Sequence, residues 1–202
     1  SKEKRCISMD FVRNVGDEAN MPFAVGGGIC SIQQIKEIIN GGAEKVIINT
    51  YAIENPDFIK QASDEYGSST IVVSIDVKKK LFGKKQIYTY GGNKSSGKDP
   101  VNFAKLMEQK GAGEIIINSI ENDGTMTGYD LQLIEDVSKA VTIPVVAVGG
   151  AKNISDFHKA TEAYASAVAA GSMFVYHGPR NAVLINYPSE KEIQKAFGIN
   201  QV

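Results

Sequence analysis

Two carboxylates follow strand-like runs and are the residues best suited to acid–base chemistry. Asp76 ends the run TIVVSID, in which alternation places Val72, Ser74 and Asp76 on one face. A carboxylate beside an apolar wall has a raised pKa and can act as a general acid or base. Asp76 could instead cap a helix or pair with Lys78, and Asp123, in ENDGT, could simply form a turn.

Glycines offer a second kind of chemistry, the binding of phosphate by backbone N–H groups. PFAVGGGI (22–29) and PVVAVGGA (144–151) are similar segments that lie 122 residues apart. Glycine lets backbone N–H groups approach an anion, and the N-terminus of a following helix adds its dipole. We expect one phosphate site in each half and a ligand with a phosphate at each end, although the glycines could instead form only tight turns. The candidates are Gly27, Gly28, Asn49 and Thr50 in the first half, and Gly149, Gly150, Gly171 and Ser172 in the second.

A pair of opposite charges is predicted at the other end of two strands. GGAEKVIIN and KGAGEIIIN resemble each other, and alternation places Lys45 on the face of Asn49 and Glu114 on the face of Asn118. If the asparagines face the mouth of a barrel, Lys45 and Glu114 face its closed bottom. Buried opposite charges are costly unless they pair. This pair could be purely structural, or it could form a gate.

The elements that position these residues alternate between β-branched runs and amphipathic stretches. QIYTY (86–90) indicates a small hairpin above the sheet. Apolar strands separated by helices are typical of parallel strands buried on both faces. The pattern predicts strands over 23–27, 46–49, 70–76, 114–120, 144–150 and 166–172, and helices over 31–42, 56–67, 100–110, 130–139, 154–164 and 189–197.

Six such strands fit either an open doubly wound sheet or a closed eight-stranded barrel. The internal repeat favours an α/β (β/α)8 TIM barrel of two like halves, with its chemistry at the C-terminal ends of the strands. Counting back 122 residues from Asp123, just past one strand, reaches residue 1, so the first half begins after its own corresponding strand. We therefore expect a single barrel domain over residues 1–202, incomplete at its N-terminus, with about six of eight strands.

The charge and composition of the chain argue against several classes of protein. A net charge of −1 argues against nucleic-acid binding, and the apolar runs are too short for a membrane span. The charged start, SKEKR, is no signal peptide, and two distant cysteines, Cys6 and Cys30, fit a reducing cytoplasm. His158 and His177 have no partner at metal-ligand spacing, so neither a metal site nor a cofactor is predicted.

Longer segments resemble a known family over nearly the whole chain. VGGGI, GAEKVIINT, VVSIDVK, GAGEIIINSIENDGTMTGYD, PVVAVGGA and AAGSMF are similar to the cyclase subunit of imidazole glycerol phosphate synthase. The resemblance implies a (β/α)8 barrel that takes ammonia from a glutaminase subunit docked at its bottom. It implies a lyase of histidine biosynthesis that converts a bis-phosphorylated aminoimidazole carboxamide ribotide into imidazole glycerol phosphate and AICAR.

The resemblance also assigns roles to residues. It implies that Asp76 is one of two catalytic aspartates; the other would lie on a first strand that this sequence lacks, so the chain alone is expected to be inactive. Lys45 and Glu114 match half of a four-residue charged ring proposed to gate ammonia. It places one phosphate at Gly28, Asn49 and Thr50, and the other at Asp123, Gly124, Gly150, Gly171 and Ser172.

One stretch departs from that pattern. YHGPRNAVLINYPSEKEI (176–193) resembles a paralogue group associated with the amidation of surface sugars. This leaves an alternative function, a non-catalytic or ammonia-delivering partner subunit in the amidation of a surface-polysaccharide sugar. An isomerase of the same pathway shares the fold and both phosphates, but the segment SIENDGTMTGYD favours the cyclase.

Overall fold

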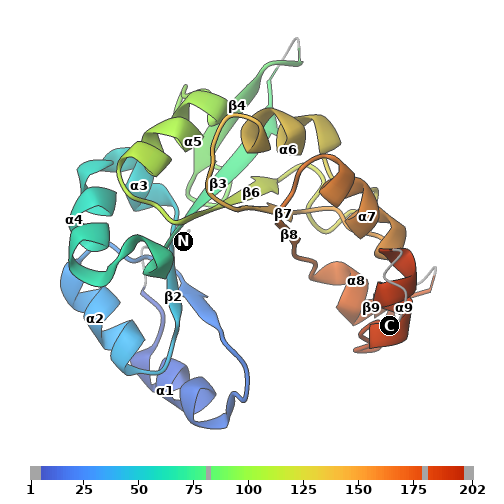
Figure 1. Ribbon diagram of the computed structural model, residues 1–202, viewed down its shortest axis with the longest axis horizontal. Coiled ribbons are helices and arrows are strands. Elements are labelled where there is room, and N and C mark those ends of the chain that lie inside the picture. The colour runs from blue at the N-terminus through green and yellow to red at the C-terminus, as the bar shows by residue number, and fades with distance from the viewer. Residues whose placement is uncertain (1–5, 81–82, 179–181, 198–202) are drawn as a thin grey trace.

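Six parallel strands form the centre of the computed structural model, which describes residues 6–80, 83–178 and 182–197. They are β1 (Ala24–Gly26), β2 (Lys45–Ile48), β3 (Ile71–Lys79), β6 (Glu114–Ser119), β7 (Val145–Val148) and β8 (Ala167–Val168). Strands that follow each other in this order are also neighbours in the sheet. The sheet curls into an open arch with helices along its outer side (Figure 1). This is a partial (β/α)8 barrel, as predicted.

Helices connect successive strands, and six of those in the described residues begin at a capping side chain. Ser31 and Gln34 form a capping box, and Asp99 and Asp130 cap two later helices. The helices are α1 (Met9–Glu18), α2 (Ile32–Asn40), α3 (Thr50–Glu54), α4 (Asp57–Tyr66), α5 (Pro100–Gln109), α6 (Leu131–Ser138), α7 (Ile154–Glu162), α8 (Ser172–Val175) and α9 (Glu190–Ala196), with a 3-10 turn, η1 (Ser68–Thr70). The predicted helices are all present, whereas α1, α3 and α8 were not predicted.

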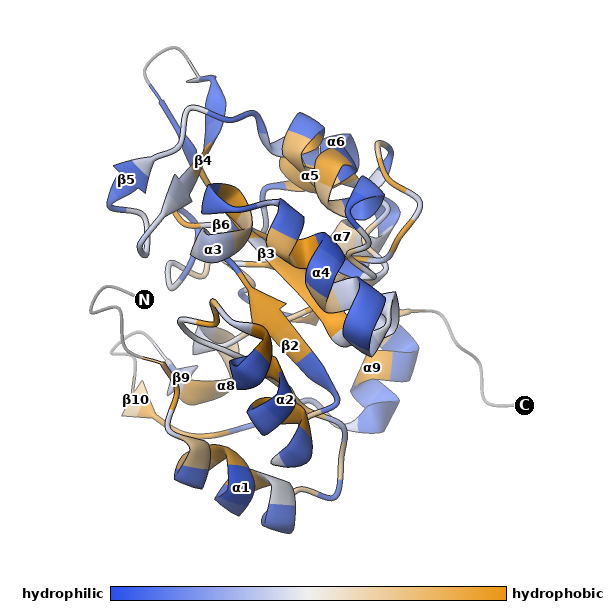
Figure 2. Cartoon of the chain, turned by 90° about the vertical axis from the view of Figure 1, so that its left-hand side faces the viewer, coloured by the Kyte–Doolittle hydropathy of each residue, from blue (hydrophilic) through white to orange (hydrophobic). Residues whose placement is uncertain are grey.

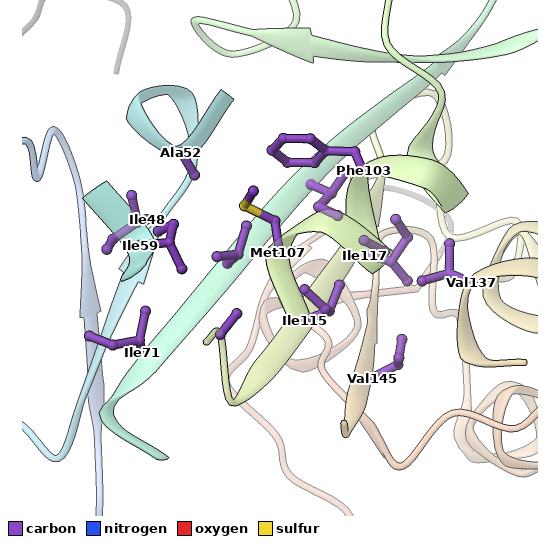
Figure 3. Close-up of a cluster of buried hydrophobic side chains, with 14 of the residues drawn as sticks. Ile48, Ala52, Ile59, Ile71, Phe103, Met107, Ile115, Ile117, Val137 and Val145 are labelled. Carbon is purple, nitrogen blue, oxygen red and sulfur yellow. The ribbon is translucent and has the colours of Figure 1, made fainter. Parts of the chain in front are cut away.

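The hydrophobic core lies between the outer face of the sheet and the helices. Ile48 and Ile115 point outward and are buried among helix residues such as Met107 (Figure 3). Figure 2 shows hydrophobic residues along the strands and hydrophilic residues on the outward sides of the helices. On the inner wall, Ile47 and Ile116 are only half-buried. Val72, on the same wall, is 1% exposed, so the predicted burial on both faces holds at Val72 and is incomplete at Ile47 and Ile116.

The repeat in the sequence is also a repeat in the structure. Adding 122 to the first residue of α1, α2 and α3 gives the first residue of α6, α7 and α8. Their N-cap residues correspond in the same way, for example Ser31 with Asn153 and Asn49 with Gly171. The same offset relates β1 and β2 to β7 and β8. The two halves therefore place equivalent turns and helix starts at equivalent positions.

Two hairpins are added to this frame. β4 (Lys85–Thr89) pairs antiparallel with β3, and β5 (Lys94–Ser95) pairs with β4. Because β4 pairs with residues 76–79, β3 continues to Lys79 and does not end at Asp76 as predicted. The second hairpin, β9 (Tyr176–His177) with β10 (Ala182–Val183), was not predicted. None of the helices in the described part of the chain is long and apolar enough to cross a membrane.

Close packing of α1 on α2 gives a test of the fold. A Cβ atom at Gly16 would lie 2.3 Å from the carbonyl oxygen of Gly41. Alanine usually stabilises a helix interior relative to glycine by up to ~1 kcal/mol, so a loss of stability would report this contact. We expect Gly16→Ala to lower the free energy of unfolding by ~1–3 kcal/mol in thermal melts. The control is Gly171→Ala, where a Cβ meets nothing within 4 Å; equal melting of both variants would contradict the packing.

Candidate active site

Asp76 lies on the inner wall of the arch, between two asparagines. It pairs in register with Asn118 of β6, whose Nδ2 donates a 3.0 Å hydrogen bond to Asp76 Oδ1. Burial raises the pKa of Asp76; hydrogen bonds from Asn118 and Asn49 oppose this shift without cancelling it, and the charge of Asp123 adds to it. Among the described residues, Asp76 forms no ion pair and caps no helix. The alternatives of a helix cap or a Lys78 partner are therefore wrong.

The predicted residues of the first half surround Asp76. Gly27 and Gly28 follow β1, while Asn49 and Thr50 join β2 to α3. These four residues line a cavity of about 550 Å³ that Asp76 also lines. We call these four residues the first cradle. The structure therefore brings the candidate acid–base group and one candidate phosphate site into the same space.

The predicted residues of the second half also come together. They line a small cavity of about 20 Å³, and we call them the second cradle: Asp123, Gly124, Gly149, Gly150, Gly171 and Ser172. A Cβ at Gly150 would lie 2.3 Å from the carbonyl oxygen of Gly128, and its φ of 106° strains other residues. Gly150 is therefore needed for packing, whatever it binds. Asp123 lies in a turn, since its N–H donates to the carbonyl oxygen of Ser119.

Two buried acceptors flank Asp76 without a protein partner. Asn49 Oδ1 and Asn118 Oδ1 receive no hydrogen bond from the described residues, although Asn49 Nδ2 donates to Ser74 Oγ at 3.5 Å. An unsatisfied buried acceptor costs ~1–3 kcal/mol. A ligand with N–H or O–H groups would remove that cost. The wall around Asp76 is thus suited to a polar substrate.

The predicted charge pair lies at the opposite ends of the strands. Lys45 Nζ is 2.7 Å from Glu114 Oε2, and the two side chains are 33% and 19% exposed. They belong to β2 and β6, so the ion pair reaches across β3 on the inner wall. The predicted pairing is confirmed, while its role as a gate stays a prediction.

Several residues of the first cavity were missed by the sequence analysis, above all Tyr90 and Glu54. Tyr90 N donates a 3.2 Å hydrogen bond to Thr50 Oγ1, and the Tyr90 hydroxyl donates to Glu54. The hydrogen bond to Glu54 raises the pKa of Tyr90. The hairpin was predicted above the sheet, but no pattern indicates that the backbone N–H of Tyr90 reaches Thr50 or that its side chain reaches Glu54.

Known proteins are similar in sequence to this chain over most of its length. The family model described as "Histidine biosynthesis protein" matches residues 1–179. The imidazole glycerol phosphate synthase subunit HisF of Pyrococcus furiosus is 45% identical over 177 residues, which are 87% of this chain and 70% of the relative. The chain belongs to the HisF family. The HisF subunit of Thermococcus onnurineus is 42% identical over 194 residues, 96% of this chain and 76% of the relative.

Membership of the HisF family confirms the resemblance seen in the sequence motifs. The HisF subunit of Alkaliphilus metalliredigens is 40% identical over 178 residues, 88% of this chain and 71% of that relative. The matched segment contains Asp76 and the residues of both cradles. The roles of the individual residues stay predictions, and substitutions at Asp76 and in the second cradle can test them.

The pKa of Asp76 predicts how stability changes with pH. Its folded-state pKa lies above the unfolded value of about 3.9, so the folded protein binds more protons between the two values. The stabilisation that Asp76 provides is therefore fully present below its unfolded-state pKa, and it is lost as the pH rises through its folded-state pKa. Asparagine does not ionise, so Asp76→Asn does not lose this stabilisation. The free energy of unfolding of the variant, relative to that of the wild type, should therefore rise with pH and then level off. Urea unfolding from about pH 3 to about pH 8 measures this difference.

Asp17→Asn, at an exposed position, is the control for the loss of a carboxylate in the same chain. The opposite result is a stability of Asp76→Asn, relative to wild type, that falls as the pH rises. It would mean that the folded state favours the ionised carboxylate, contrary to the rise in pKa that burial produces.

The second cradle can be tested at Gly171. A Cβ there meets nothing within 4 Å and the φ of −117° suits any residue, so Gly171→Val should fold normally. Its methyl groups would stand at the border of the cavity that Gly171 lines, where they hinder the approach of an anion to the backbone N–H groups. Titration calorimetry should show at least ~tenfold weaker binding of a bis-phosphate, the loss of one charge-assisted hydrogen bond. Unchanged affinity in a normally melting variant would exclude this cradle as a phosphate site.

Proposed function

We propose that this protein is the cyclase subunit of imidazole glycerol phosphate synthase, a lyase within a glutamine amidotransferase complex. The observation that carries the proposal is the position of Asp76. It lines the same cavity as the first cradle. Its hydrogen-bond partner Asn118 lies next to Gly149, a residue of the second cradle. The HisF relatives carry the corresponding name.

The substrate is a bis-phosphorylated aminoimidazole carboxamide ribotide with one phosphate in each cradle. Ring formation from ammonia and this ribotide requires proton transfer to departing oxygen and nitrogen atoms. A carboxyl whose pKa is raised keeps a larger protonated fraction near neutral pH, so it can donate a proton and take one back. Asp76 fills that role, and Asn118 holds its carboxylate by the 3.0 Å hydrogen bond.

The ammonia comes from a glutaminase subunit docked at the N-terminal ends of the strands. The ion pair of Lys45 with Glu114 lies at this end of the inner wall. Ammonia that enters there reaches Asp76 along the inner wall when the two side chains separate. The pair therefore acts as the gate between the two subunits.

A second candidate function rests on the C-terminal segment. The family model ends at residue 179, and beyond it Val183, Ile185 and Tyr187 are 73%, 70% and 67% exposed. Large exposed apolar side chains in one segment favour contact with another protein. In this case the barrel delivers ammonia for the amidation of a surface-polysaccharide sugar, without catalysing ring formation itself.

Ammonia-dependent turnover of the ribotide by the full-length protein tests the proposal. Asp76→Asn keeps the size and one acceptor of the side chain but removes its proton exchange. We expect ribotide binding to be retained and the rate to fall by ~10²–10⁴. Free ammonia is supplied so that the glutaminase does not affect the result.

Asp17→Asn again serves as the control and should retain the wild-type rate. A normal rate for Asp76→Asn would exclude Asp76 as the acid–base group. Ribotide binding without turnover in the wild type, with co-purification of a glutaminase and a sugar amidotransferase, would favour the second candidate.

A further inference from the structure

A third and larger cavity lies outside both cradles. It measures about 710 Å³. Its lining comes from the start of α7, from α8 and β9, and from single residues elsewhere in the chain: Met126, Gly178, Asn186, Pro188 and Glu192. None of the residues that line it also lines the cavity at Asp76. We call it the outer cavity. Its volume is far more than one phosphate group needs.

The outer cavity borders the second cradle directly. Met126 lines both spaces. Ala151 of the cradle cavity precedes Lys152 of the outer cavity, and Ser172 precedes Met173 in the same way. A ligand whose phosphate lies in the second cradle can therefore extend its organic group into the outer cavity, which shares no lining residue with the cavity at Asp76.

Part of the lining of the outer cavity is apolar. Ile154 and Met173 pack against the hydrophobic core, which fixes their positions. Tyr176, 41% exposed, adds an aromatic side chain, and thioethers make favourable contacts with aromatic rings. Such surfaces suit a flat aromatic group better than a sugar alone.

Another part of the lining is polar. Lys152, Ser155 and Asn186 all line the cavity. The ammonium group of Lys152 forms no ion pair with any described carboxylate, while its backbone N–H donates to Asp156 Oδ2 at 3.0 Å. Glu192 adds a carboxylate, which accepts a hydrogen bond from Ser189 Oγ. The cavity thus offers an ammonium group and a carboxylate together with amide and hydroxyl groups for the polar edge of an aromatic ring.

We propose that the outer cavity binds the nucleoside part of a nucleoside monophosphate whose phosphate occupies the second cradle. The inference rests on the proposed function in one respect, since it uses the same phosphate cradle. It adds a ligand that does not reach Asp76 and that competes with the bis-phosphorylated substrate for this cradle.

Titration calorimetry of the full-length protein with AMP, ribose 5-phosphate and inorganic phosphate tests the inference. Stacking of a base on an aromatic side chain predicts that AMP binds at least roughly tenfold more tightly than either other probe. AMP that binds no more tightly than ribose 5-phosphate would overturn the inference.

A variant that fills the outer cavity makes the test specific. Ser155 is exposed in the first turn of α7, so Ser155→Trp should fold while it blocks the space. It should abolish the preference for AMP and leave the affinity for inorganic phosphate unchanged. Glu162→Trp, 67% exposed at the other end of α7, is the matched control and should bind AMP like wild type.

The outcomes separate this inference from the proposed function. If Ser155→Trp keeps the preference for AMP, the base binds elsewhere and only the inference fails. If the wild-type protein binds neither inorganic phosphate nor the ribotide, the second cradle itself is wrong and both fail.

Discussion

Six successive residue pairs tie β3 to β6, from Val72 opposite Glu114 to Val77 opposite Ser119. Because side chains alternate along a strand, this register sends Ile115 and Ile117 into the helices and leaves Asn118 on the inner wall. A slip by one residue would exchange the two faces of β6. It would force Asn118 into the core and expose the isoleucines. The register that builds the core is therefore the one that places a hydrogen-bond donor beside Asp76.

On β2 and β6, the inner wall has polar ends and an apolar middle. On β2, Ile47 separates Lys45 from Asn49, and on β6, Ile116 separates Glu114 from Asn118. A charged species would lose hydration in crossing this apolar layer, whereas a small neutral molecule would lose much less. The proposed route for ammonia is consistent with that arrangement. Apolar side chains of β2 and β6 thus lie between the ion pair at one end of these strands and the acid–base site at the other.

The features that could be predicted from the sequence are those that depend on the period of the side chains or on the internal repeat. All six strands, the helix pattern and the grouping of the second cradle follow from alternation and from the repeat. Helices α3 and α8 could not be predicted in this way, because four or five residues show no helical period. The contact of Tyr90 with Thr50 depends on how a hairpin folds back over a separation of 40 residues. The half-buried inner wall depends on the curvature of the whole sheet, which no local pattern records.

The internal repeat has a consequence for the direction in which a ligand binds. Two equivalent cradles offer similar anchors, so a molecule with a phosphate at each end could enter either way round, and only one orientation presents the correct atoms to Asp76. The borders of the two cradles are unequal. Tyr90 and Gly91 of the β4–β5 connection line the first cavity, whereas the chain beyond the second cradle continues from α8 into β9. Discrimination between the two ends of such a ligand therefore depends on these non-repeated additions to a symmetric frame.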